Sequence, residues 1–110
     1  YSQAILAGNT VYVSGQLPID PATGTMPEDV AAQAAQSMKN IQAILAGAGL
    51  SMDDIVKTTI LMADLSGFAA VNEVYGSFFK KDFPARACYQ VAALPKNALL
   101  EIEAVAVKGE

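Results

Sequence analysis

The stretch that decides the fold begins with Phe83-Pro84-Ala85-Arg86-Ala87-Cys88-Tyr89-Gln90-Val91. It continues with Leu94-Pro95-Lys96 and then with Glu101-Ile102-Glu103-Ala104-Val105-Ala106. Apolar and polar residues alternate on both sides of Leu94-Pro95, which predicts two strands joined by a proline-containing turn. On the first strand Arg86, Cys88 and Gln90 share one face, because side chains alternate along a strand. The neighbours of Arg86 along this strand, Ala85, Ala87 and Cys88, are small or apolar. Its charge therefore needs an anionic partner from elsewhere. That partner could be a carboxylate of the protein or of a ligand.

The length and composition of the chain limit its class. A chain of 110 residues predicts one domain, residues 1–110, that is small enough to gain from association. Apolar residues make up 53% and charged residues 16%, against about 45–50% and 25% in typical domains. No run approaches the roughly 18 apolar residues of a membrane span, and no basic start precedes a signal-peptide core. We expect a soluble, cytoplasmic protein with no membrane partner, whose apolar surplus lies in subunit contacts.

The residue types present exclude several kinds of site. A single cysteine cannot form an internal disulfide and gives no metal-ligand spacing. The absence of histidine excludes Ser-His-Asp and Cys-His catalysis and the usual zinc sites, so we expect no metal. The net charge is −4, and the longest basic cluster is Lys80-Lys81. The chain has few basic side chains that could neutralise the phosphates of a nucleic acid, so we expect no nucleic-acid partner.

Turn signals predict a hairpin and a loop in the first quarter of the chain. Gly8-Asn9 suits the positive φ angles of a tight turn between Ile5–Ala7 and Val11–Ser14, so we expect a hairpin that ends at Gly15. Two prolines and a glycine within residues 16–25 break both helix and ladder, so this segment is predicted to be a loop.

Apolar residues that recur at three- and four-residue steps predict two helices. Thr25-Met26-Pro27-Glu28 has the spacing of a capping box at the start of the first helix, which Gly47 and Gly49 end. Ser66 can cap the second helix, and Asp82-Phe83-Pro84 stops it. The first stripe comprises Val30, Ala34, Met38, Ile41, Leu45 and Ala48, with Gln33 outside it, and the second comprises Phe68, Val71, Val74, Tyr75, Phe78 and Phe79.

The β-branched residues of the segment 55–62 predict a further strand, so the element order is ββαβαββ. Two strand-helix-strand connections favour an α+β fold with two helices packed on one face of a mixed β-sheet. The other face stays uncovered within one chain. We therefore expect it to close against partner subunits.

Six motifs in this order carry a resemblance over the whole chain. They are Tyr1-Ser2-Gln3-Ala4, Val13-Ser14-Gly15-Gln16, Asp54-Ile55-Val56-Lys57-Thr58-Thr59, Asn72-Glu73-Val74-Tyr75, Phe83-Pro84-Ala85-Arg86, and Leu94-Pro95-Lys96 with Glu101-Ile102-Glu103-Ala104. Together they resemble the RidA/YjgF/UK114 family of reactive-intermediate (enamine/imine) deaminases. Two departures are visible: the family usually has a short segment ahead of Tyr1, and Asn97 stands where Gly or Asp is common.

The resemblance implies a chorismate-mutase-like homotrimer with clefts at the subunit interfaces. It also implies hydrolysis of 2-aminoacrylate/2-iminopropanoate and 2-iminobutanoate to 2-oxo acids and ammonia, with no cofactor. The family's site pattern falls on Tyr1, Ser14, Gly15, Asn72, Arg86, Cys88 and Glu101.

The chemistry of a 2-imino acid, a carboxylate beside an electrophilic C=N carbon, suggests two catalytic residues. Arg86 suits the carboxylate clamp, because its planar guanidinium can donate two hydrogen bonds and keeps its charge. Glu101 suits a general base that deprotonates water and then an acid that releases ammonia. Antiparallel pairing through the Leu94-Pro95 turn would bring Glu101 near Arg86. Burial would raise the pKa of Glu101 and Arg86 would lower it.

The remaining site positions would bind and orient the substrate. The backbone N–H groups of Gly15 and Cys88 can hold its carboxylate, and Gly15 permits a close approach. The Cys88 carbonyl can hold the water, while Ser14, Asn72 and the Tyr1 ring would close the pocket. Cys88 fits a small buried residue better than a nucleophile, because no histidine activates it.

Three other interpretations stay open. Arg86 and Glu101 could form a structural or interface ion pair instead of a site. The chain could be a non-catalytic regulatory protein that binds a 2-oxo acid or another small carboxylate in the same cleft. A ribonuclease function fits the acidic composition poorly.

Overall fold

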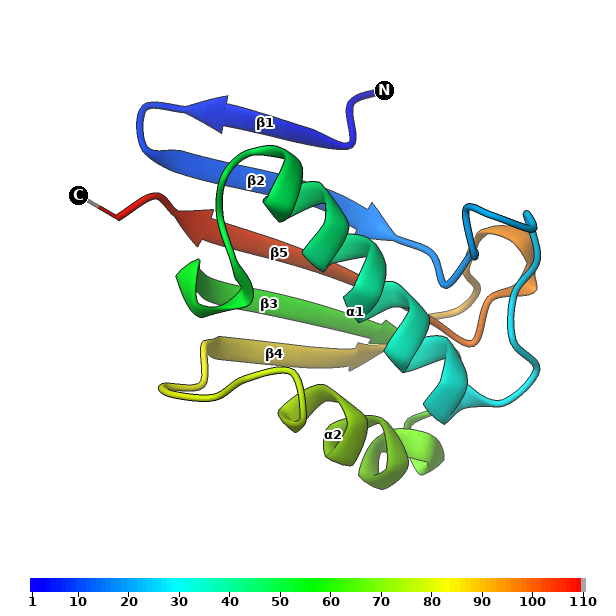
Figure 1. Cartoon of the computed structure of the whole chain (residues 1–110). Helices are drawn as coiled ribbons and strands as arrows, with labels where there is room; N and C mark the ends of the chain where they lie inside the picture. Colours follow the sequence, from blue (N-terminus) through cyan, green and yellow to red (C-terminus); the bar gives the residue numbers. More distant parts are fainter. Residues whose placement is uncertain (110) are drawn as a thin grey trace.

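The computed structural model describes residues 1–109, and within them the predicted ββαβαββ order is confirmed (Figure 1). The strands are β1 (Ala4–Ala7), β2 (Thr10–Gln16), β3 (Ile55–Met62), β4 (Ala85–Gln90) and β5 (Leu100–Val107). The helices are α1 (Val30–Gly47) and α2 (Phe68–Gly76), with 3-10 turns η1 (Met52–Asp54), η2 (Leu65–Gly67) and η3 (Pro95–Asn97).

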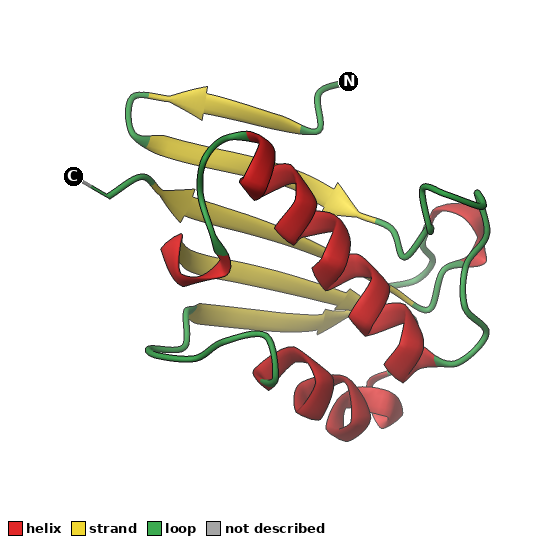
Figure 2. Cartoon of the chain, viewed as in Figure 1, coloured by secondary structure: helices red, strands yellow, loops and turns green. Residues whose placement is uncertain are grey.

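The strands form one mixed sheet in the order β1-β2-β5-β3-β4. β3 and β4 are parallel, and the other neighbours are antiparallel. Both helices lie on the same side of the sheet (Figure 2). The α+β class and the mixed sheet with helices on one face are therefore confirmed.

β5 lies between β2 and β3, so the predicted pairing of the two strands around Leu94-Pro95 is wrong. The residues of β5 that face the helices are buried, with Leu100 and Ile102 at 0% exposure, and the backbone groups of so buried a strand find hydrogen-bond partners in β2 and β3. β4 carries Arg86 and the exposed Tyr89 and lies at the sheet edge, where charged and polar side chains are tolerated. Residues 91–99 are long enough to cross the end of β3.

The hairpin between β1 and β2 is confirmed, with a positive φ of 61° at Gly8. Further along β2 the register with β5 slips by one residue. Val13 pairs with Ala104, but Gln16 pairs with Ile102, so three steps on β2 oppose two on β5. Ser14 and Gly15 therefore lie in a β-bulge, a feature that re-aims backbone and side chains locally.

Both predicted helix starts are corrected. The carboxylate of Asp29, and not Thr25, caps α1 by accepting a hydrogen bond from the Ala32 N–H at 2.6 Å. Thr25 is used elsewhere, because its carbonyl accepts from the Asp20 N–H and closes a turn over residues 20–25. Asp64, and not Ser66, caps the second helical segment by accepting from the Ser66 N–H.

Two further details of the helices differ from expectation. α2 ends at Gly76, well before the predicted stop at Asp82-Phe83-Pro84, although Phe79 still packs in the core. Gln33 is buried on α1, because its side-chain amide donates to the Pro27 carbonyl and accepts from the Leu99 N–H. This pair of bonds ties two loops to the helix.

The sheet face away from the helices is open in one chain. Along β5 the residues alternate, so Glu101, Glu103 and Val105 lie on this face while Leu100 and Ile102 lie under α1. The large apolar side chains on the open face include Ile5, Tyr12, Tyr89 and Val107, each at least 40% exposed. Among residues 1–109 no helix is long and apolar enough to cross a membrane.

Candidate functional site

Arg86 lies at the sheet edge on the helix-covered face of β4, opposite Thr58 of β3. One guanidinium nitrogen, Nη1, donates a 2.6 Å hydrogen bond to the side-chain oxygen of Asn72. The guanidinium carbon lies 5.1 Å from the centre of the Phe68 ring and 5.0 Å from that of Tyr75. Within residues 1–109 the guanidinium has no carboxylate partner, so its charge is uncompensated.

Phe68, Asn72 and Tyr75 reach Arg86 together because they are four and three residues apart on α2, which places them on one helix face. A cavity of about 380 Å³ adjoins this group, and its lining includes Asn72, Arg86 and the exposed Phe83. A cation beside an open cavity can receive a small anionic ligand.

Glu101 lies on the open face of β5, next to the β2 bulge. A Cβ added at Gly15 would lie 2.6 Å from a carboxylate oxygen of Glu101, so any other residue here would displace the carboxylate from this position. Burial raises the pKa of the Glu101 carboxyl, and the neighbouring Glu103 raises it further. A carboxylate with a raised pKa is a stronger proton acceptor than an ordinary glutamate, as a general base requires.

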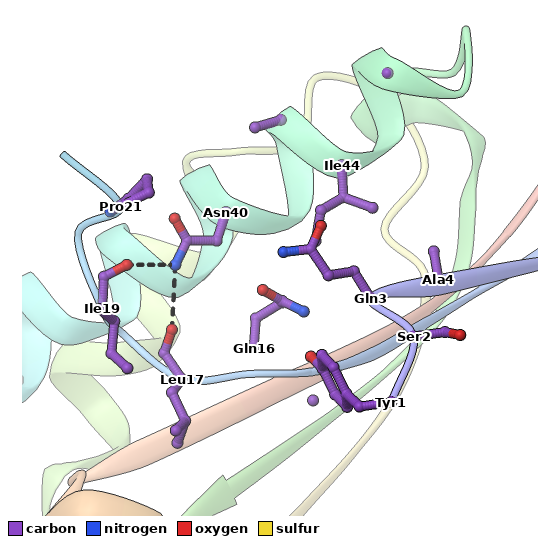
Figure 3. A pocket seen from close by; sticks show the side chains of 13 residues that line it. Tyr1, Ser2, Gln3, Ala4, Gln16, Leu17, Ile19, Pro21, Asn40 and Ile44 are labelled. Carbon is purple, nitrogen blue, oxygen red and sulfur yellow. Dashed lines mark hydrogen bonds between the residues drawn. The ribbon is translucent and has the colours of Figure 1, made fainter. Parts of the chain in front are cut away.

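Ser14 and Tyr1 lie close to Gly15, because Ser14 precedes it in the β2 bulge and Tyr1 lines the same cavity as Gly15. The Ser14 hydroxyl donates to the Ser2 carbonyl at 2.5 Å, and the Ser14 N–H donates to the Gln3 carbonyl at 2.9 Å. Ser14 therefore holds the segment that carries Tyr1, whose side chain is 99% exposed. A cavity of about 900 Å³ lies between this segment and α1, with Tyr1 and Gly15 in its lining (Figure 3).

Cys88 shares the helix-covered face of β4 with Arg86 and packs against the hydrophobic core. Burial raises the pKa of the Cys88 thiol, and the nearby Arg86 acts in the opposite sense. A thiol with a raised pKa is a poor nucleophile at neutral pH. Within residues 1–109 no three Asp, Glu, Cys or His side chains cluster as metal ligands.

The expected proximity of Arg86 and Glu101 within one chain is wrong. Arg86 lies in the row of Thr58 and Ala104, whereas Glu101 lies in the row of Leu61. Three residues along the strands and two strand spacings separate them, which is about 14 Å between Cα atoms. Their side chains also point to opposite faces of the sheet. One chain therefore carries two separate groups: Arg86 with Asn72 and Cys88, and Glu101 with Tyr1, Ser14 and Gly15.

Three of the residues that surround Arg86 were not predicted from the sequence to lie near it. Phe68 and Tyr75 were assigned to the helix core only, and Thr58 to a strand. The signal was present in the spacing, since Phe68, Asn72 and Tyr75 recur on one face of a helix that leads back to the strand of Arg86. What the spacing lacks is the parallel register that places Thr58 beside Arg86.

Comparison with known proteins assigns the chain to a family. A family model described as Endoribonuclease L-PSP matches residues 1–108. The chain belongs to the RidA/YjgF/L-PSP family. This membership confirms the resemblance derived from the sequence motifs.

Relatives within the RidA/YjgF/L-PSP family match the chain almost from end to end. A Haemophilus influenzae RutC family protein is 54% identical over 112 residues, which cover 98% of this chain and 86% of the relative. A human 2-iminobutanoate/2-iminopropanoate deaminase is 52% identical over 110 residues, which cover 99% and 80%. The crystal structure of E. coli TdcF with bound serine has a TM-score of 0.96 at 48% identity and covers 99% of this chain and 88% of that one.

Proposed function

We propose that this chain is a 2-iminobutanoate/2-iminopropanoate deaminase that hydrolyses enamine and imine intermediates to 2-oxo acids and ammonia. The observation that carries the proposal is the uncompensated guanidinium of Arg86 beside a cavity. The 52% identity to a human deaminase of that name supports the substrate class. A relative solved with serine bound agrees with a site for a small molecule that carries a carboxylate.

The complete site would combine two chains of a homotrimer. Arg86, Asn72 and Cys88 of one subunit would face Tyr1, Ser14, Gly15 and Glu101 of its neighbour, because one chain holds the two groups about 14 Å apart and on opposite faces. The open sheet face, with Ile5, Tyr12, Tyr89 and Val107 exposed, supplies apolar surface for the assembly. A cyclic arrangement would repeat the same cleft at each interface.

In the proposed reaction Arg86 binds the substrate carboxylate and Glu101 handles the protons. The oxygen of a water molecule bonds to the imine carbon while Glu101 accepts a proton from the water and passes it to the imine nitrogen, which gives a neutral carbinolamine. Glu101 then takes the proton of the carbinolamine hydroxyl and delivers it to the amine nitrogen, so that the C=O bond of the 2-oxo acid forms as the C–N bond breaks and ammonia leaves. For an enamine, protonation at the β-carbon first gives the imine.

Replacement of Arg86 by alanine tests this function. We expect Arg86→Ala to lower kcat/KM for 2-iminobutanoate by about 100-fold or more, because a charged, two-point contact to a carboxylate is lost. Ammonia release would be followed with iminobutanoate generated enzymatically in the same vessel, and the mass in solution would be measured for both proteins. Unchanged activity with a weakened oligomer would mean that Arg86 is an interface residue.

The same assay separates two other functions. Binding of 2-oxobutanoate without ammonia release would identify a small-carboxylate regulatory protein. The description of the family model as an endoribonuclease makes RNA cleavage a second control. Cleavage that Arg86→Ala abolishes would reinstate a ribonuclease function, against which the net charge of −4 argues.

A further inference from the structure

The side chains that hold Arg86 are all uncharged. Phe68 and Tyr75 place their rings about the guanidinium, at 5.1 and 5.0 Å from its carbon, and Asn72 accepts one hydrogen bond. We call Phe68 and Tyr75 the aromatic cradle. Neither residue is among the site positions that the family resemblance implies, although Tyr75 ends one of its motifs, and neither is needed to explain the proposed chemistry.

Tyr75 is itself held in place by a hydrogen bond and by a ring contact. Its hydroxyl is 2.6 Å from the Thr58 hydroxyl, and its ring packs at 5.0 Å against that of Phe79. Only 3% of Tyr75 is exposed. Thr58 is also the register partner of Arg86 in the β3–β4 pair. One residue of β3 therefore lies beside Arg86 and also holds the Tyr75 ring that contacts it.

An aromatic cradle holds a cation without neutralising it. The π faces attract the guanidinium, whereas a carboxylate would form an ion pair that a ligand would have to displace. An exposed arginine has about 2 kcal/mol of rotamer entropy to lose when it is ordered. Ordering it in advance leaves less to lose when a ligand binds.

We propose that Phe68 and Tyr75, with Tyr75 anchored by Thr58, are positioning residues that preorganise Arg86 to bind the substrate carboxylate. This inference rests on the proposed function. Burial raises the pKa of the Tyr75 hydroxyl, against the opposing effects of Thr58 and Arg86. The hydroxyl therefore stays protonated at neutral pH, and no negative charge arises beside the guanidinium.

Matched leucine substitutions test the cradle. We expect Phe68→Leu to raise the Kd for 2-oxobutanoate and the KM for 2-iminobutanoate by about 2- to 5-fold, the equivalent of one cation–π contact at an exposed site, with a smaller change in kcat. Phe68→Tyr keeps the ring and should restore both constants. Phe78→Leu is the control, because Phe78 packs against the same core and is not among the aromatic rings that contact Arg86.

A second variant tests the buried half of the cradle. Tyr75→Leu is combined with Thr58→Val, so that no hydroxyl is left buried without a partner. We expect weaker 2-oxobutanoate binding with unchanged oligomer mass. Should this variant fail to fold, as judged by circular dichroism, Phe68→Leu decides the question.

The outcomes distinguish the cradle from the function on which it rests. If Arg86→Ala loses both 2-oxobutanoate binding and ammonia release while Phe68→Leu keeps the Kd within twofold of the wild-type value, the cradle is overturned and the deaminase proposal stands. An unchanged Kd in Arg86→Ala overturns both, because there is then no carboxylate clamp to position.

Discussion

Arg86 is the residue on which the functional argument depends, because its charge has no acidic partner within residues 1–109. Within one chain the strand order prevents the simplest alternative, an ion pair between Arg86 and Glu101, because β3 lies between their two strands. Sequence reasoning found both residues from their type and from the motifs around them. It misplaced them relative to each other, since strand adjacency depends on contacts between residues far apart in the chain.

For Gly15 and Asn72 the residue type indicated a role in the site, but it did not indicate which side chain each would meet. Gly15 was predicted to let the substrate approach its backbone closely, and the structure places the carboxylate of Glu101 2.6 Å from where a Cβ would be. Asn72 was predicted to orient a substrate, and it accepts a hydrogen bond from Arg86. A polar helix position does not by itself tell which strand residue it will meet.

Glu101 gives a prediction on stability against pH. Because folding raises the pKa of Glu101, its ionised carboxylate destabilises the native state. This destabilisation is absent below the ordinary Glu pKa of 4.5, where the carboxyl is protonated, and it grows as the pH rises through the pKa of the folded state. In dissociated subunits, where no neighbouring Arg86 faces the carboxylate, we therefore expect Glu101→Gln to be more stable than wild type at pH 7, by less than about 1 kcal/mol because the group is only half-buried.

Urea denaturation at a fixed protein concentration low enough to keep the subunits apart would measure this difference. The two proteins should converge in stability below pH 4.5, where the wild-type carboxyl is protonated in both folded and unfolded states. A Glu101→Gln protein that is less stable than wild type at pH 7 would show that the folded state favours the ionised carboxylate.

The elements themselves were largely predictable, because hairpins, helices and isolated strands are coded by local patterns. Gly8-Asn9 placed the first hairpin, and the periodicity of residues 30–47 placed α1. The position of β5 was not predictable in this way. Alternation describes its buried and open faces correctly, but the choice of β2 and β3 as its neighbours is set by packing under α1.

The start of α1 gives a prediction at this scale. Asp29→Ala should destabilise the protein by about 1 kcal/mol, because the first turn of the helix loses the acceptor for the Ala32 N–H. Thr25→Ala is the matched control, since Thr25 has capping chemistry but lies in the preceding turn; its effect should stay within about 0.5 kcal/mol. Equal losses in the two variants, measured by urea denaturation, would contradict the assignment of the cap.

The molecule as a whole presents one covered and one open sheet face, and the functional residues are divided between them. The apolar surplus of the sequence predicted an uncovered face, and the exposed side chains of Ile5, Tyr12, Tyr89 and Val107 lie on it. The same division explains why the residues of the proposed site could be named from the sequence but not assembled. In the proposed site their meeting depends on how two copies of the chain face each other.

Mixing two inactive variants tests this division most directly. Arg86→Ala and Glu101→Gln would be unfolded together in equal amounts, refolded, and assayed for ammonia release from 2-iminobutanoate. If each site takes Arg86 from one subunit and Glu101 from the next, random assembly gives an intact pair at about one site in four, so roughly a quarter of the wild-type activity should return. Activity no greater than that of the separate variants would show that the two residues do not act across an interface.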